Sequence, residues 1–128
     1  MGLSDHRVGA TIAVSDMDGA KGFYEGKLGL TPGPMDEPQG VVYECGDGST
    51  LFVYHSPKHA GKATATIATW EVPDLDQTVD ELAARGVVFE RYEEFEGDER
   101  GIHTVGDEGR VAWFKDPEGN TIAVSQFD

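Results

Sequence analysis

The sequence has few of the features that mark secreted, membrane or nucleic-acid-binding proteins. Cys45 is its only cysteine, which excludes an internal disulfide and predicts a cytoplasmic location. No stretch approaches the roughly 20 apolar residues of a membrane span, and Met1 to Val8 lack the apolar run of a signal peptide. Bases are also scarce, with 10 against 24 acids and a net charge of −14. Nucleic acid and anionic membranes are therefore not expected as partners.

What the sequence does contain is typical of one globular domain. Its 128 residues are 38% hydrophobic and 27% charged, enough to form a core without disulfides. The acidic balance favours a cationic ligand or serves solubility alone, and composition does not separate these two interpretations.

An internal repeat organises the chain. Residues 10–18 (ATIAVSDMD) recur as residues 68–76 (ATWEVPDLD). Each copy predicts a strand followed by an aspartate that caps a helix. Apolar spacing predicts these helices over residues 17–28 and 75–85, each ended by a glycine.

Each half of the sequence also ends in a predicted hairpin. In the first, Asp47-Gly48 suits a two-residue turn in which both residues have positive φ. This turn would pair Tyr43 with Phe52. Because side chains alternate along a strand and cross-strand partners share a face, Tyr43, Phe52 and Tyr54 would then line one face of the sheet.

In the second hairpin, Pro117-Glu118-Gly119 suits a three-residue loop with glycine in the left-handed position. It would pair Trp113 with Ala123. Residues 93–100 carry the charge and glycine of a solvated loop, and a role as a lid is the alternative.

The sequence thus predicts an α+β fold of two tandem βαβββ modules in a single domain over residues 1–128. Module one spans about residues 7–57 and module two about residues 63–127. The remaining strands are expected near residues 31–35 and 87–92.

Two motifs allow a comparison with a known family. Val14-Ser15-Asp16 precedes Phe23-Tyr24 and Leu28-Gly29-Leu30, and Asp116-Pro117-Glu118-Gly119-Asn120 lies near the end of the chain. They resemble the first-module signature and the closing turn of the vicinal oxygen chelate superfamily, the glyoxalase/bleomycin-resistance proteins and extradiol dioxygenases. The resemblance covers nearly the whole chain. It implies a curved mixed sheet and a homodimer whose clefts combine modules from two chains.

The resemblance also implies where a metal would bind. Metal-using members carry His or Gln on the first strand of each module and Glu near its end. These positions fall on Gly9, Phe52, Ile67 and Ala123, none of which has a donor side chain. A divalent site needs several converging His or carboxylate ligands. We therefore expect no metal and no cofactor, as in the metal-free bleomycin-resistance-like members.

The histidines do not suggest a replacement site. They are His6, His55, His59 and His103. No nucleophile elbow, phosphate-binding loop or dinucleotide fingerprint is present, and no catalytic residue is assigned.

Aromatic and small residues occupy the expected cleft instead. The candidate ligand-binding residues are Tyr43, Phe52, Tyr54, Ile67, Thr69, Glu71 and Trp113. The first hypothesis is a metal-free protein that sequesters a small aromatic or cationic compound, as in antibiotic resistance. The alternatives are a lyase, isomerase or dioxygenase with a displaced metal centre, and a structural or regulatory dimer. The pattern is compatible with two arrangements: Phe52 and Trp113 line an open cleft, or they fill it.

Overall fold

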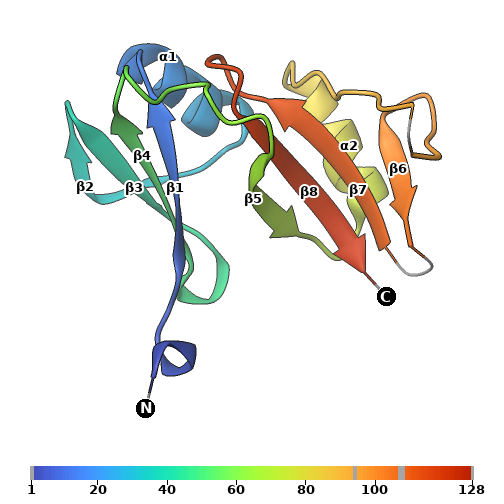
Figure 1. Ribbon diagram of the computed structural model, residues 1–128, viewed down its shortest axis with the longest axis horizontal. Helices are drawn as coiled ribbons and strands as arrows, with labels where there is room; N and C mark the ends of the chain where they lie inside the picture. Colours follow the sequence, from blue (N-terminus) through green and yellow to red (C-terminus); the bar gives the residue numbers. More distant parts are fainter. Residues whose placement is uncertain (1, 94, 107–108, 128) are drawn as a thin grey trace.

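The computed structural model of the chain describes residues 2–93, 95–106 and 109–127. It consists of two four-stranded mixed sheets, each built from one half of the chain (Figure 1). The elements are β1 (Gly9–Val14), α1 (Met17–Lys21), β2 (Pro32–Glu37), β3 (Gly40–Glu44), β4 (Thr50–His55), β5 (Thr66–Glu71), α2 (Leu75–Ala84), β6 (Ile102–Val105), β7 (Gly109–Lys115) and β8 (Thr121–Phe127).

The two sheets repeat one topology. Their strand orders are β1-β4-β3-β2 and β5-β8-β7-β6. In each, the first pair is parallel and the others are antiparallel. The predicted α+β fold with two tandem βαβββ modules is confirmed. No helix in the described part of the chain is long and apolar enough to cross a membrane.

Both helices begin where the repeat predicts. Asp16 and Asp74 each accept a hydrogen bond from the backbone N–H three residues later, at 3.0 and 3.1 Å. The first helix changes character after one turn and continues as a π-helical segment over Gly22–Lys27. There the Leu28 amide donates to the Phe23 carbonyl, five residues back. One predicted helix is therefore two short segments.

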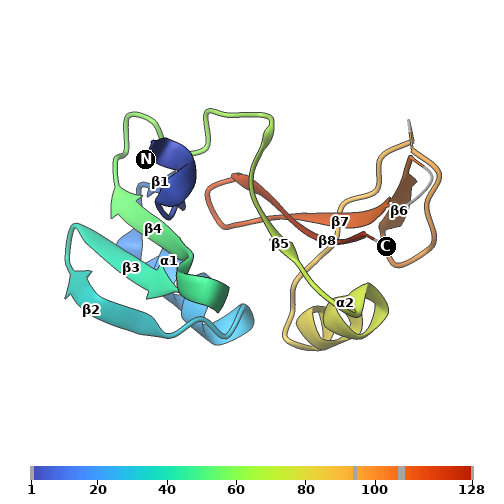
Figure 2. The same ribbon diagram turned by 90° about the horizontal axis from the view of Figure 1, so that it is seen from below.

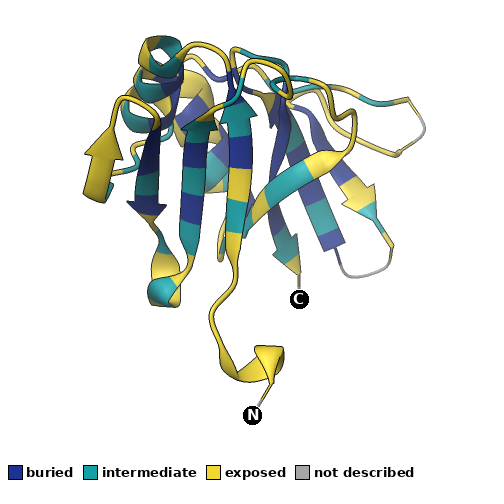
Figure 3. Ribbon diagram, turned by 60° about the vertical axis from the view of Figure 1, so that its left-hand side comes forward, coloured by how far each residue is buried: buried dark blue, intermediate teal, exposed yellow. Residues whose placement is uncertain are grey.

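One hydrophobic core joins the two modules on the helix side of both sheets. Burial alternates along β3 and β4, with Val41 and Val53 fully enclosed and Val42 and Phe52 only half-buried (Figure 3). Figure 2 shows both helices on the same side of the angle that the sheets make. We call the opposite side of each sheet its open face. The open faces of the two sheets point in different directions.

The first hairpin differs from the prediction by one residue. A three-residue turn, Gly46–Gly48, closes it and pairs Tyr43 with Leu51 rather than with Phe52. A one-residue shift moves a side chain to the other face of a sheet. Tyr43 is accordingly buried in the core, where its hydroxyl donates to Glu25 at 2.9 Å. The prediction that Tyr43 shares a face with Phe52 was wrong.

The second hairpin forms as predicted, but the strand before it does not. Trp113 pairs with Ala123, and Gly119 has a φ of 92°. The strand expected near residues 87–92 contributes a single bridge at Phe89, whose ring packs against the core. The outer strand of the sheet is instead β6, which the apolar pattern did not single out.

The closing turn of module two contacts module one through a buried carboxylate. Asp116 is 5% exposed and accepts hydrogen bonds from the Tyr24 hydroxyl at 2.7 Å and from the Glu118 and Asn120 amides at 2.9 Å. The Asn120 side chain donates to it as well, and to the Ala13 carbonyl at 3.0 Å. Burial and the charge of Asp116 raise the pKa of the Tyr24 hydroxyl, which remains a donor.

This junction predicts the effect of removing one hydroxyl. Tyr24→Phe should lower the free energy of unfolding by about 1.5–3 kcal/mol, the range for hydrogen bonds to charged groups. Tyr43→Phe is the matched control, because its partner Glu25 is only half-buried and water can replace the lost bond. Urea unfolding of both variants measures the difference. Equal losses would show that the buried carboxylate has no special part in stability.

Candidate aromatic ligand site

Two of the predicted site residues form a stacked pair on the open face of the first sheet. The rings of Phe52 and Tyr54 lie 5.4 Å apart with an interplanar angle of 16°. Both are half-buried, and Val42 lies beside them on β3. This pair provides a flat aromatic surface that the hydrophobic core does not use.

An irregularity in β5 changes which of its residues face outward. Thr66 pairs with Thr121 and Ala68 with Ile122, so Ile67 is an extra residue between them. Thr66 therefore shares the open face with Thr69, and Ile67 packs against the edge of the core. Ile67 and Thr69, both candidate ligand-binding residues, therefore do not share a face of β5 because of this bulge.

Trp113 lies on the open face of the second sheet, where other aromatic residues already cover it. Its indole N–H donates to the Thr66 hydroxyl at 3.0 Å. The rings of Tyr92, Phe95 and His103 lie 5.2, 5.4 and 5.3 Å from it. Side chains of the protein thus occupy much of the space beside this indole. Trp113 itself is half-buried.

One of these rings, Phe95, comes from the segment predicted to be a solvated loop, of which Glu94 lies outside the described residues. Much of this segment is exposed, yet the Thr104 amide donates to the Glu96 carbonyl at 2.7 Å and the Asp98 amide to the Ile102 carbonyl at 2.9 Å. These bonds pair the segment with β6. Its sequence has the composition of a free loop, but backbone pairing and the Phe95 ring hold it against the sheet.

Arg100 ties the end of this segment to α2. Its guanidinium lies 2.6 Å from Asp76, 3.1 Å from Asp98 and 3.5 Å from Asp80. Arg110 contacts Asp76 as well, at 3.2 Å. Hydrogen bonds from Arg100 and Arg110 lower the pKa of the Asp76 carboxyl below its usual value. These pairs are exposed and add modestly to stability.

Sequence reasoning missed Tyr92, Phe95 and His103 as site residues. His103 is 2% exposed and pairs with Val111, which places it on the open face beside Trp113. Placing β6 correctly would have identified it, since alternation in Ile102–Val105 puts His103 opposite the core.

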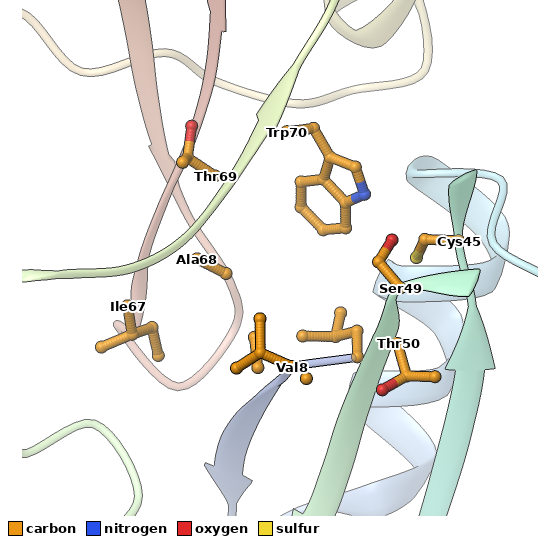
Figure 4. A pocket seen from close by; sticks show the side chains of 11 residues that line it. Val8, Cys45, Ser49, Thr50, Ile67, Ala68, Thr69 and Trp70 are labelled. Carbon is orange, nitrogen blue, oxygen red and sulfur yellow. The ribbon is translucent and has the colours of Figure 1, made fainter. Parts of the chain in front are cut away.

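A separate cavity of about 390 Å³ lies where β1 and β5 approach each other (Figure 4). Gly9, Ile67 and Thr69 are among its lining residues. Figure 4 shows the indole of Trp70 pointing across it toward Cys45. Trp70 also packs against the core, so its side chain contacts both the cavity and the core.

The four family metal positions do not converge on donor groups. Gly9 and Ile67 line this cavity, whereas Phe52 and Ala123 lie on the two open faces. Within the described residues, no group of three or more His, Cys, Asp or Glu side chains is arranged to hold a metal ion.

The predicted site residues are therefore distributed over several places. Glu71 is exposed and lines a different depression, with Asp47 and Gln126. Phe52 and Tyr54 lie together, Thr69 and Trp113 share the second open face, and Tyr43 lies in the core. Within one chain, the structure assembles two aromatic surfaces rather than one cleft.

The chain matches the family model for the Glyoxalase/Bleomycin resistance protein/Dioxygenase superfamily over residues 5–124. It belongs to this family. Among solved structures, it is similar to a glyoxalase/bleomycin resistance protein from Catenulispora acidiphila, with 27% identity and a TM-score of 0.73. That match covers 95% of this chain and 98% of the other.

Two further structures share the fold at lower identity. TnmS3, an antibiotic binding protein from Streptomyces sp. CB03234, is 23% identical with a TM-score of 0.68, covering 96% of each chain. A lactoylglutathione lyase from Agrobacterium tumefaciens is 18% identical with a TM-score of 0.70, covering 94% of this chain and 96% of that one. No curated protein matches the sequence significantly. Proteins with this fold thus include one named as a binding protein and one named as an enzyme, so the fold alone does not specify function.

Proposed function

We propose that this family member is a metal-free binding protein that sequesters a small aromatic compound. The observation that carries the proposal is the pair of aromatic surfaces on the open faces, Phe52 with Tyr54 on one sheet and Trp113 on the other. Planar ligands bind by stacking on such rings, with a few polar groups fixing their orientation. Thr66 and Thr69 supply polar groups beside Trp113.

Two further observations support this function. TnmS3, which shares the fold, binds an antibiotic. The net charge of −14 draws cationic compounds toward the protein, and Glu71 on the second open face adds a local negative charge. A cationic aromatic compound is therefore the ligand class that these features favour.

The proposal includes a homodimer. The open faces of one chain point in different directions, so they do not enclose a ligand between them (Figure 2). A second copy that places its second sheet against the first sheet of its partner would bring Phe52 and Tyr54 opposite Trp113. Symmetric dimers are the commonest oligomers and would form two such sites.

The binding function predicts the behaviour of Trp113. A screen of planar aromatic compounds that includes bleomycin should find one that quenches tryptophan emission. Trp113→Ala should then weaken its affinity by about 1–3 kcal/mol, taking base–aromatic stacking as the nearest analogue. If the indole were only packing, the same change would cost about 3–5 kcal/mol of folding stability. A well-folded Trp113→Ala protein with unchanged affinity would contradict this site.

Trp70→Phe is the matched control for that experiment. Trp70 lies beside the 390 Å³ cavity rather than on an open face. Quenching that persists in Trp70→Phe and disappears in Trp113→Ala assigns the ligand to the second open face. The reverse result would move the site to the junction of β1 and β5.

Metal content separates this function from the enzymatic alternative. Protein purified without chelators should contain no stoichiometric Zn, Ni, Fe or Mn, because Gly9, Phe52, Ile67 and Ala123 offer no donor. Chelator should leave the melting temperature unchanged, since a lost metal would lower it. One metal per chain by elemental analysis would favour a lyase, isomerase or dioxygenase with a displaced centre.

The oligomeric state tests the proposed dimer. Light scattering should give twice the 13.8 kDa chain mass. Phe52→Asp places a charge on the proposed interface and should give monomers, because burying an unpaired charge is costly. Val88→Asp is the control, since Val88 is 78% exposed and belongs to no strand of either sheet. A monomer in the unaltered protein, or equal dissociation in both variants, would contradict the arrangement.

A further inference from the structure

The cavity where β1 and β5 approach each other reaches from the surface to the hydrophobic core. Ala10 and its partner on β4, Leu51, both line it and both belong to the core packing. Leu51 is 2% exposed, whereas Val8, another lining residue, is 85% exposed. A molecule from solution can therefore enter this cavity and contact core side chains from both modules.

The size and charge of this cavity indicate what it would hold. Its volume of about 390 Å³ lies within the roughly 300–1,000 Å³ of small-molecule sites. In the described part of the chain, no Asp, Glu, Lys, Arg or His is among its lining residues, although the protein carries a net charge of −14. An ion inside would lose hydration without gaining a partner of opposite charge. The cavity therefore favours an uncharged molecule.

The indole N–H of Trp70 is an available donor in this cavity. No residue in the described ranges accepts a hydrogen bond from it, whereas the other indole, Trp113, donates to Thr66. The Trp70 nitrogen is also accessible, because the buried polar side-chain atom without a partner in the described residues is Nδ1 of His103 alone. Figure 4 shows the indole pointing across the cavity toward Cys45. An acceptor for this N–H can therefore come from a molecule bound there.

The hydroxyl groups that line the cavity are mostly paired already. Ser49 donates to the Gly46 carbonyl at 2.7 Å, and the Thr69 hydroxyl lies 3.4 Å from that of Ser125. The Thr50 hydroxyl has no such partner among the described residues. An apolar lining with a few free polar groups is typical of small-molecule sites.

We propose that this cavity is a second binding site, for an uncharged and largely apolar molecule with a hydrogen-bond acceptor, such as a carbonyl oxygen, to which the Trp70 indole N–H donates. The inference goes beyond the proposed function, because neither the place nor the ligand charge is that of the open faces. Trp70 also packs against the core, so the donor is held in position before the ligand arrives.

Three probes with one bicyclic skeleton test the ligand class. Camphor carries a carbonyl group, bornane has CH₂ in its place, and bornylamine carries an ammonium group at neutral pH. In titrations followed by protein amide resonances, camphor should bind about three- to tenfold more tightly than bornane, the net effect of one hydrogen bond. Bornylamine should bind more weakly than camphor in salt that screens long-range attraction.

The two tryptophans provide an internal control for the donor. The chain contains only Trp70 and Trp113, so ¹H–¹⁵N spectra show two indole cross-peaks. In the unaltered protein, camphor should move the Trp70 peak downfield, because its N–H gains an acceptor, and bornane should not. The Trp113 peak should stay in place with both probes, since its N–H already donates to Thr66.

Variants assign the preference for camphor to Trp70. Trp70→Phe keeps a ring but removes the donor, and it should bring the affinities for camphor and bornane together. His55→Phe also removes a ring N–H but lies at the opposite end of β4 from Thr50, so it should leave the preference intact. The indole shift is measured on the unaltered protein, so it remains decisive if Trp70→Phe fails to fold.

Equal affinities for camphor and bornane, no detectable binding of either, or an unmoved Trp70 peak would overturn this site. Bornylamine binding as tightly as camphor would overturn the assignment to uncharged ligands. These results leave the proposed function standing, because its aromatic ligand is tested by quenching of Trp113. Loss of that quenching, with the camphor result as expected, would instead remove the open-face site and leave this one.

Discussion

The arrangement of the two modules depends on the hydrogen bonds that the buried carboxylate of Asp116 accepts. It orders its own turn through the Glu118 and Asn120 amides and at the same time receives the Tyr24 hydroxyl from module one. Glu118 extends the contact by accepting from the Ser15 hydroxyl at 2.7 Å. A buried charge is tolerated only with several donors around it. The turn and the first helix must therefore keep this relative position.

That position determines which surfaces are left for binding. With the helices and the inner faces of both sheets committed to one core, the open faces of the sheets are left for binding, and they point in different directions. The aromatic residues on them differ in their situation. Phe52 and Tyr54 stack on each other, while Trp113 is enclosed by Tyr92 and Phe95. The aromatic surface of the second sheet is therefore the more enclosed of the two.

Much of the fold was predictable from local chemistry. Asp16 and Asp74 cap helices because a carboxylate after a strand satisfies free backbone amides, and the two copies of this pattern indicate the duplication. The three-residue loop before Asn120 was also predictable from local chemistry, since it needs glycine at positive φ. Of the site, Phe52, Tyr54, Thr69 and Trp113 were placed on open faces by alternation alone.

By itself the sequence determined the family, the duplicated modules, the helix starts and the absence of donors at the four metal positions, because each depends on residue type or short spacing. Tertiary structure decided the rest. One added residue in the Gly46–Gly48 turn put Tyr43 in the core, and one bulge turned Ile67 away from Thr69. The pairing of β6 brought His103 under Phe95. Such choices depend on contacts between segments distant in sequence, where a shift of one residue reverses the face that a side chain occupies.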